Sequence, residues 1–327
     1  MRAFVTGGSG FVGRELIASL VAAGHEVVAL ARSEAADAAV AAAGATPARG
    51  DVLDVASLAR GMAGADVVFH AAAYVKEWGP REDFERVNVG GTRNVLEASR
   101  SAGVRRVVHV STEAVLLGSG PIRGADETRP LPKRAMGRYG GTKNEAERVV
   151  RAANDPAGEG LETVVIRPRF VWGRGDTSLL PQLVDAAEAG RLAWVSGGRY
   201  PTSTCHVRNL AAGALLAAER GRPGGVYFLT DGAPVEFRDF ITRYLATQGV
   251  TPPDKTVPRV IAKPVSALVE GLWVLFRRKT APPVHRTPVW LMGEEVTVDD
   301  GLARRELGYA PAVSVAAGLA EMTPPAG

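Results

Sequence analysis

The 327-residue sequence has a single cysteine, Cys205, and little net charge. One cysteine excludes an internal disulfide and any metal site that needs several thiolates, and it fits a reducing cytoplasm. The net charge of +4 comes from 39 basic and 35 acidic residues. They are scattered without a basic block, so nucleic acid is not an expected partner. No basic and apolar leader precedes the first strand, and we expect a cytoplasmic protein.

Histidine is also scarce, with five in the chain. His25, His206 and His285 show no ligand spacing with carboxylates or with Cys205. His109 stands inside an apolar strand, where a core histidine is expected. We therefore predict no metal site.

What the sequence does contain, at its start, is a glycine-rich turn between an apolar strand (1–6) and an amphipathic helix. Gly7 permits a tight turn, Gly10 lets the backbone approach a pyrophosphate, and Gly13 lets the helix pack closely on the strand. The N–H groups and positive dipole end of the helix then face the anion. This context predicts a dinucleotide site, whose candidate residues are Thr6, Gly7, Ser9, Gly10, Phe11, Val12 and Gly13.

Strand and helix patterns alternate along the next 160 residues. Further strands are expected at 26–31, 45–49, 66–70, 106–110 and 162–167, and helices at 34–43, 81–102 and 137–153. This alternation predicts an α/β fold, a Rossmann-type doubly wound parallel sheet with a smaller C-terminal α/β substrate domain. We assign 1–171, with 204–230 returning, to the cofactor domain, and 172–203 and 231–327 to the substrate domain. Ligands should lie at the carboxyl ends of the strands.

The end of the second predicted strand indicates which nicotinamide cofactor is preferred. An acidic residue there would bind the ribose 2′-hydroxyl of NAD, but the chain has Arg32, whose guanidinium suits a 2′-phosphate. NADP(H) is therefore predicted. NAD(H) stays an alternative, because Arg32 can equally be a solvated surface residue and Glu34 is close by. Asp51 and Val52, after the third strand, are expected to flank the adenine.

A series of motifs in order along the chain resembles the extended short-chain dehydrogenase/reductase family. The motifs are TGGSGFVG at the start, Gly50-Asp51-Val52, His70-Ala71-Ala72-Ala73, Asn88 within VNVGGT, Tyr139-Gly140-Gly141-Thr142-Lys143, and Arg167-Pro168 followed by Val171-Trp172-Gly173. The resemblance covers nearly the whole chain. It implies further cofactor contacts by the backbone of 70–73 and by Asn88, Lys143, Arg167, Pro168 and Val171, with no imidazole chemistry at His70.

The same resemblance implies the catalytic residues. Tyr139 and Lys143, four residues apart, share one helix face, so the Lys143 ammonium can lower the pKa of the Tyr139 phenol and hold the nicotinamide ribose. Tyr139 would exchange a proton with the substrate oxygen as hydride moves. Family members place a Ser or Thr three residues before a Val, and Val115 selects Thr112 over Ser111 as the residue that orients the substrate oxygen.

The reaction class follows from which family features are present. Related dehydratases carry two acids after the catalytic Thr, but here Glu113 is followed by Ala114, so dehydration is not expected. An NAD-dependent nucleotide-sugar epimerase stays the alternative enzyme. A non-catalytic NADP-sensing regulator is the alternative outside enzymes, although such proteins commonly lose the Tyr/Lys pair.

The second half resembles the branch of 3β-hydroxysteroid and sterol-4-carboxylate 3-dehydrogenases. The matching stretches are RPRFVWG, Gly225 to Gly232 and Leu307-Gly308-Tyr309. The sequence departs from the pattern of this branch at one position, because Arg208 precedes Asn209 where the branch usually has an Asp. The branch implies an oxidoreductase that interconverts a ketone and a secondary alcohol on a hydrophobic, steroid-like or β-keto acyl, substrate.

Residues 257–279 carry apolar side chains at helical spacing. Lys263, Pro264 and Glu270 make this stretch too polar to span a bilayer. It could contact a membrane surface peripherally or pack on its own domain, and we predict that it covers the substrate pocket. The family resemblance also implies a homodimer formed through the helices after the fourth and fifth strands.

Overall fold

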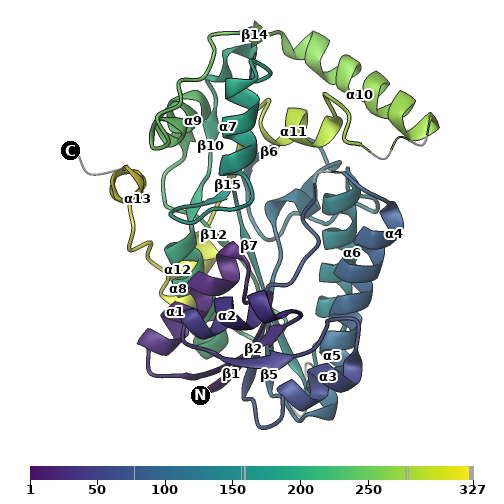
Figure 1. The fold of residues 1–327 in the computed structure, drawn as a ribbon, viewed down its shortest axis with the longest axis vertical. Coiled ribbons are helices and arrows are strands. Elements are labelled where there is room, and N and C mark those ends of the chain that lie inside the picture. Colours follow the sequence, from purple (N-terminus) through teal and green to yellow (C-terminus); the bar gives the residue numbers. More distant parts are fainter. Residues whose placement is uncertain (77, 156, 158–159, 277, 279, 324–327) are drawn as a thin grey trace.

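The chain folds around one parallel sheet of seven strands (Figure 1). The computed structural model describes residues 1–76, 78–155, 157, 160–276, 278 and 280–323. The strands of the sheet are β1 (Arg2–Thr6), β2 (Glu26–Ala31), β3 (Thr46–Arg49), β4 (Val67–His70), β5 (Arg106–Val110), β7 (Glu162–Pro168) and β12 (Val226–Leu229). Their order is β3-β2-β1-β4-β5-β7-β12, and every pair is parallel. The predicted Rossmann-type fold is therefore confirmed.

The order in which successive strands are added to the sheet reverses between β1 and β4, which are neighbours. From β1 the strand order runs outward to β3 on one side and through β4 to β12 on the other. In open α/β sheets, ligands bind at such a switch point, beyond the carboxyl ends of the strands. Thr6 and His70, the last residues of these two strands, are partners in the register and mark this position.

Helices cover both faces of the sheet and enclose two hydrophobic cores. The first core includes residues of α1 (Phe11–Ala22), α2 (Glu34–Ala42), α8 (Val207–Arg220) and α12 (Gly301–Leu307). The second includes residues of α3 (Val55–Gly61), α5 (Gly91–Ser101) and α6 (Arg138–Ala152). The strands between them are apolar on both faces, as a sheet covered on both sides requires. Although the sequence assigns 231–327 to the smaller domain, α12 packs in the first core.

The predicted helix at 81–102 is interrupted by a wider turn. It consists of α4 (Arg81–Phe84), a π-helical turn at Glu85–Gly90 and α5. π-Helical turns inside α-helices are frequent at functional sites. Asn88, the predicted cofactor-site residue, lies in this turn and is buried.

A second, smaller sheet and several helices stand above the carboxyl ends of the main strands (Figure 1). Its four strands, in spatial order, are β13 (Val235–Glu236), β10 (Pro201–Thr202), β15 (Val296–Val298) and β6 (Ile122–Ala125). Two short pairs are β8 (Val171–Trp172) with β11 (Cys205–His206), and β9 (Trp194–Val195) with β14 (Thr256–Val257). The remaining helices are α7 (Leu180–Glu188), α9 (Phe237–Ala246), α10 (Arg259–Leu275), α11 (Arg286–Leu291) and α13 (Val315–Met322).

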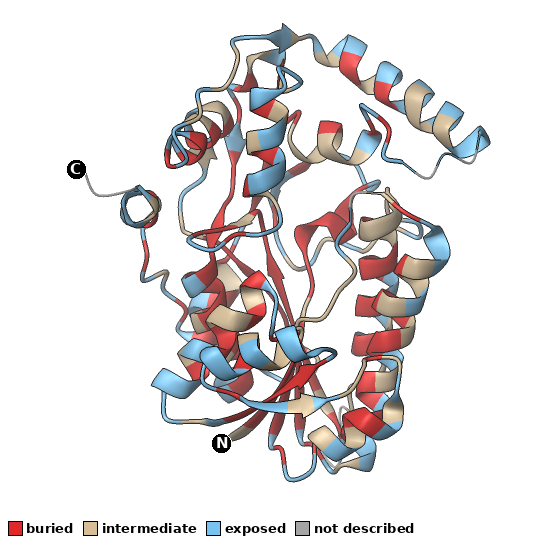
Figure 2. Ribbon diagram, in the orientation of Figure 1, coloured by how far each residue is buried: buried red, intermediate tan, exposed pale blue. Residues whose placement is uncertain are grey.

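The smaller part has an aromatic core of its own, in which Trp172, Phe240 and Tyr244 are fully buried. Helix α10 is different, because most of its length is exposed or half-buried (Figure 2). Within the described residues, no helix combines the length and the apolar composition that crossing a bilayer requires.

Candidate functional site

The turn between β1 and α1 leaves no room for side chains at two of its glycines. Gly7 has a φ of +74°, and a Cβ there would lie 2.7 Å from the backbone N of Ala72. A Cβ on Gly13 would lie 2.1 Å from the carbonyl O of Gly7, so α1 packs directly on the turn. Gly10, in contrast, is exposed. The first N–H groups of α1 therefore face an open side, where a pyrophosphate fits.

The other residues predicted around this turn differ in exposure. Ser9 is exposed, Val12 is half-buried and Phe11 is buried. The Thr6 hydroxyl lies 2.7 Å from Nδ1 of His70 and accepts a hydrogen bond from the N–H of Ala72. Thr6 thus joins the end of β1 to the segment that follows β4.

At the far side of the sheet, the predicted adenosine-binding residues lie at the ends of β2 and β3. Arg32 is exposed, and among the described residues it forms no hydrogen bond or ion pair. The neighbouring Arg49, at the end of β3, is instead paired with Asp37. Asp51 accepts the N–H of its neighbour Leu53, while Val52 is buried and accepts a hydrogen bond from Asn94. Arg32 is therefore available for a ligand anion.

His70 is locked between two threonines. Its Nδ1 lies 2.7 Å from Oγ1 of Thr6, and its Nε2 lies 2.9 Å from Oγ1 of Thr92. Burial, with the nearby Lys143 charge, lowers the pKa of His70 to about 3. The imidazole is therefore neutral and links β1, β4 and α5. This structural role agrees with the expectation that His70 takes no part in the chemistry.

The three predicted catalytic residues come from β5 and α6. Thr112 follows β5 and begins the short 3-10 helix Glu113–Leu116, while Tyr139 and Lys143 lie in the first two turns of α6. Helix α6 can approach this 3-10 helix because a Cβ on Gly140 would lie only 3.0 Å from the carbonyl O of Ala114. The amide of Asn144 also bonds the carbonyl O of Val115. These contacts hold the two segments together at the carboxyl end of β5.

Lys143 faces the sheet. Its Nζ donates to the carbonyl O of Val110 at 2.7 Å and lies 3.3 Å from Nε2 of His109. Burial lowers the pKa of Lys143 to about 8, and the charge of Glu147 acts in the opposite direction. The ammonium is thus fixed at the end of β5.

Tyr139 differs from the expectation about its acidity. Burial raises the pKa of the Tyr139 phenol above its ordinary value, and the negative charge of Glu113 raises it further. The sequence had suggested that Lys143 lowers it. The reason for the difference is that the Lys143 ammonium bonds the Val110 carbonyl, while a carboxylate stands near the phenol. Tyr139 is therefore held in the protonated form.

Asn88 joins the segment after β4 to α6. Its Oδ1 accepts the N–H of Tyr74 at 2.7 Å, and its Nδ2 donates to Oγ1 of Thr142 at 3.0 Å. The side chain thus ties Thr142, which precedes Lys143 in α6, to the segment that follows β4.

The predicted Arg167 lies in a buried ion pair. Its guanidinium and the Glu147 carboxylate are both fully buried, with Nε donating to Oε2 at 3.0 Å. The Ser111 hydroxyl donates to the same carboxylate at 2.7 Å, which supports the structural interpretation of Ser111. Of the other predicted residues here, Pro168 is the last residue of β7 and Val171 is the first residue of β8. Sequence reasoning did not identify Glu147, because its partners are 20 and 36 residues away.

A second buried ion pair, beside the predicted catalytic residue Thr112, was also missed by sequence reasoning. Glu113 and Arg169 are 4% and 2% exposed, and Nη1 of Arg169 donates to Oε1 of Glu113 at 3.1 Å. The Thr112 hydroxyl donates to the other carboxylate oxygen at 2.8 Å. The acid directly after Thr112 was visible in the sequence, but its partner was not.

The model of the 3-beta hydroxysteroid dehydrogenase/isomerase family matches residues 4–259. A 4-hydroxy-2-methyl-3-oxo-4-farnesyl-3,4-dihydroquinoline-1-oxide ketoreductase of Stigmatella aurantiaca is 51% identical over 98% of this chain and 95% of its own. A 2-alkyl-3-oxoalkanoate reductase of Stenotrophomonas maltophilia is 37% identical over 98% and 97%. Among solved structures, the dTDP-glucose 4,6-dehydratase of Streptomyces venezuelae with NAD bound has a TM-score of 0.74 and 27% identity, over 98% and 95%.

Proposed function

Since the chain belongs to the 3-beta hydroxysteroid dehydrogenase/isomerase family and is an oxidoreductase of alcohols and ketones with a nicotinamide cofactor, we propose an NADP(H)-dependent ketoreductase. The observation that carries this proposal is the arrangement of Thr112, Tyr139 and Lys143. Thr112 follows β5, Tyr139 and Lys143 lie in the first two turns of α6, and the contacts of Gly140 with Ala114 and of Asn144 with Val115 hold these two segments together.

In the proposed reaction, Tyr139 donates its phenolic proton to the substrate carbonyl oxygen. A nicotinamide cofactor, which the glycine turn after β1 and Lys143 would hold, would supply the hydride for the carbonyl carbon. The carbonyl becomes a secondary alcohol, and solvent returns a proton to the Tyr139 phenolate. Thr112 orients the substrate oxygen, and Lys143 binds the nicotinamide ribose and favours the phenolate that forms.

The preference for NADP(H) is proposed from Arg32. Its exposed guanidinium lies at the end of β2, beside the glycine turn, and it has no partner among the described residues. A 2′-phosphate would provide that partner and two acceptor oxygens. NAD is the alternative if Arg32 stays in solvent, and an NAD-dependent epimerase would then be the competing function.

We propose that the substrate is a hydrophobic ketone. Two relatives are named for ketones that carry a farnesyl or an alkyl chain, and others are named for steroids. Steroid-like and β-keto acyl substrates are both consistent with this range. A free, buried Cys205 supports a reducing cytoplasm as the location.

A peripheral membrane contact through 257–279 is proposed from the way α10 packs. Its charged side chains turn inward, where Lys263 pairs with Glu294 and Glu270 pairs with Arg286. Its outer side carries apolar residues that are 41–82% exposed, and they are Val260, Ile261, Val265, Leu268, Leu272, Val274 and Leu275. This distribution is inverted relative to a surface helix in water. An anionic lipid surface fits it, because the exposed Arg278 lies shortly after the end of the helix.

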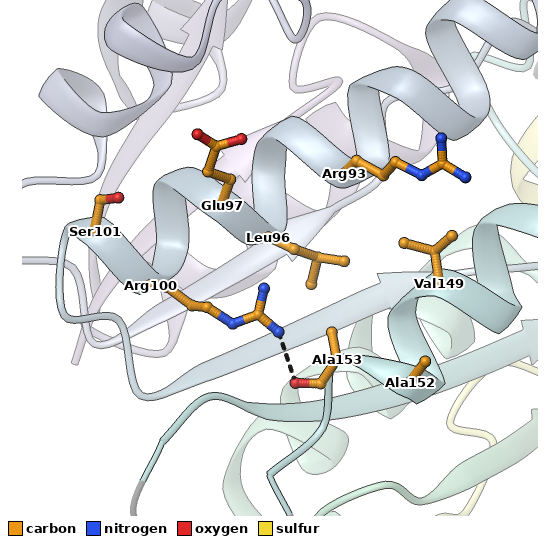
Figure 3. Close-up of a pocket in the computed structure, with 8 residues that line it drawn as sticks. All are labelled: Arg93, Leu96, Glu97, Arg100, Ser101, Val149, Ala152 and Ala153. Atoms are coloured by element: carbon orange, nitrogen blue, oxygen red, sulfur yellow. Dashed lines mark hydrogen bonds between the residues drawn. The ribbon is translucent and has the colours of Figure 1, made fainter.

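The homodimer is proposed on the outer face of α5 and α6. An open hollow of about 630 Å³ lies between these helices. Figure 3 shows Leu96 and Val149 pointing into it from the two helices, and Arg93 and Arg100 along α5 at its edge. Val149 is ten residues after Tyr139, about 15 Å along the helix. The hollow is therefore separate from the proposed catalytic site and suits a second copy of the chain.

Replacement of Tyr139 by Phe tests the proposed function. The variant keeps the ring but has no proton to donate, so kcat for a ketone with a farnesyl or alkyl chain should fall by roughly 10²–10⁴-fold. Binding of NADPH, measured by calorimetry, should be unchanged. Tyr227→Phe is the matched control, because the Tyr227 hydroxyl bonds Glu306 away from the site.

Two outcomes would contradict the proposal. If Tyr139→Phe reduces ketones as fast as the wild type, Tyr139 is not the proton donor. If the wild type binds NADPH but turns over no ketone of a broad panel, a cofactor-sensing regulator becomes the better interpretation.

A further inference from the structure

A row of polar side chains crosses the apolar main sheet near the carboxyl ends of its strands. Thr6, His70 and His109 are register partners on the neighbouring strands β1, β4 and β5. Both imidazole rings are buried, and their centres are 5.1 Å apart. His70 has a threonine hydroxyl at each of its nitrogens, which accounts for a histidine at that position. His109 has no such pair of partners among the described residues, so its presence in the core needs another reason.

The His109 ring contacts Lys143. Its Nε2 lies 3.3 Å from the Lys143 Nζ. Burial, with the Lys143 charge, lowers the pKa of His109 well below its ordinary value, so the ring is neutral. An ammonium group can only donate, so Nε2 accepts and the ring hydrogen lies on Nδ1.

The other ring nitrogen shows that this histidine is costly to the core. Nδ1 of His109 is buried and has no hydrogen-bond partner in the described part of the chain. A buried N–H without a partner costs free energy, and an apolar residue in the same strand would avoid that cost. The contact with Lys143 is therefore the favourable interaction that this residue type provides here.

The Lys143 ammonium has three hydrogens to donate. One goes to the carbonyl O of Val110 at 2.7 Å, and one goes to Nε2 of His109. These two acceptors belong to consecutive residues of β5, so together they fix the direction of the ammonium at the end of that strand. The third hydrogen is left for a ligand, and in the proposed function this ligand is the nicotinamide ribose.

Few other charged or titratable groups act on this ammonium. Burial lowers the pKa of Lys143 to about 8, and the Glu147 charge acts in the opposite direction. Glu147 is itself bound by Arg167, and His70 is neutral. A buried ammonium that is poorly solvated depends on hydrogen-bond acceptors to stay charged, and His109 is the side chain that supplies one.

We propose that His109 is a positioning residue of the ketoreductase: its neutral ring accepts a hydrogen bond from Lys143 and, with the Val110 carbonyl, directs the remaining N–H toward the nicotinamide ribose. This inference rests on the proposed function, in which Lys143 binds that ribose. It gives His109 a part in cofactor binding, although its place in an apolar strand suggested a core residue only.

The test is the dissociation constant of NADPH, measured by calorimetry on His109→Leu and His109→Gln. Leucine has a similar volume but accepts no hydrogen bond. The dissociation constant should rise by about fivefold or more, since a hydrogen bond to a charged group is worth a factor of about ten. Glutamine can place an acceptor oxygen near the position of Nε2 and should restore most of the affinity. Wild-type affinity in the leucine variant, or equal losses in both variants, would overturn the inference.

The matched control is His25→Leu. His25 is half-buried before β2, at the opposite end of the sheet, and its ring contacts the amino group of Met1. This variant should bind NADPH like the wild type.

A double-mutant cycle separates positioning from packing. If His109 acts through Lys143, then His109→Leu should add about twofold at most to the loss that Lys143→Met causes alone. A role in packing alone predicts that the two losses multiply, and that result would contradict the proposal.

His109→Asn keeps the test decisive if the leucine variant does not fold, which thermal unfolding shows. Asparagine is polar but too short to reach Lys143, so it should weaken NADPH binding as leucine does. If Lys143→Met loses affinity and no His109 variant does, His109 is not a positioning residue and the ketoreductase stands. If Lys143→Met binds NADPH as tightly as the wild type, the ribose contact of the proposed function is wrong, and the inference falls with it.

Discussion

At the residue scale, the partners of each ionisable side chain decide its role. Lys143 and Tyr139 have the spacing that suggests a directly coupled pair, yet the Lys143 ammonium bonds the Val110 carbonyl. Arg167 stands in a motif associated with cofactor binding, and its guanidinium is bound to Glu147. A residue type in a motif thus indicates a location, while the chemistry depends on what the side chain contacts.

Arg32 is the residue on which cofactor choice can be tested. We expect NADPH to bind at least tenfold tighter than NADH, a difference of about 1.4 kcal/mol. Arg32→Ala should lose that margin, because the guanidinium would no longer pair with the 2′-phosphate, while NADH binding should be unchanged. Calorimetry with all four cofactor forms measures this.

Arg60→Ala is the control for that experiment, since Arg60 is also an exposed arginine of the cofactor domain and lies in α3. Equal binding of NADH and NADPH by the wild type would show that Arg32 is a surface residue. NAD-dependent dehydrogenase or epimerase chemistry would then become the leading proposal.

At the element scale, α10 is the segment whose burial departs most from its sequence pattern. The apolar spacing at 257–279 suggested that it covers the substrate pocket, and its inner side does pack on α11 through Lys263, which lies over the Trp290 ring at 3.5 Å. Its outer apolar side stays exposed, with Leu268 at 65% and Leu275 at 72%. Pro264 lies within this helix.

A membrane contact through α10 predicts that the wild-type protein floats with vesicles of phosphatidylcholine and phosphatidylglycerol. Leu268→Glu/Leu275→Glu should lower the bound fraction at least tenfold, because charged carboxylates replace side chains each worth roughly 1.5–3 kcal/mol on burial. Binding should weaken with added salt and with pure phosphatidylcholine.

The control for the vesicle experiment is Val21→Glu, which changes an exposed apolar residue of α1 instead and should float like the wild type. If the wild type does not bind either kind of vesicle, the membrane proposal is wrong. A dimer that the α10 variant dissociates would assign this surface to a second copy.

At the scale of the whole molecule, the chain passes between its two parts several times. β6 lies early in the sequence and joins the smaller sheet, while α12 comes late and packs in the core of the large sheet. Arg169 connects the two parts, because it bonds both Glu113, next to the proposed catalytic residue Thr112, and the carbonyl O of Leu291 in α11.

The proposed homodimer can be tested by sedimentation equilibrium. Ala152 is exposed at the hollow between α5 and α6, and Ala152→Glu would place a charge in the proposed interface. We expect it to weaken dimerisation at least tenfold. Ala35→Glu, an exposed position on α2, should leave the association unchanged. A wild-type protein that is monomeric at micromolar concentration would contradict the dimer.

The sequence by itself determined the alternation of strands and helices, the glycine turn and the positions of Thr112, Tyr139 and Lys143, because each depends on neighbours a few residues away. Only the tertiary structure decided that Glu113 meets Arg169, that Glu147 meets Arg167, and that α10 turns its charges inward. These pairs join residues 20 to 56 positions apart. No local period encodes such a contact, since it forms only when distant elements pack and a buried charge requires a partner.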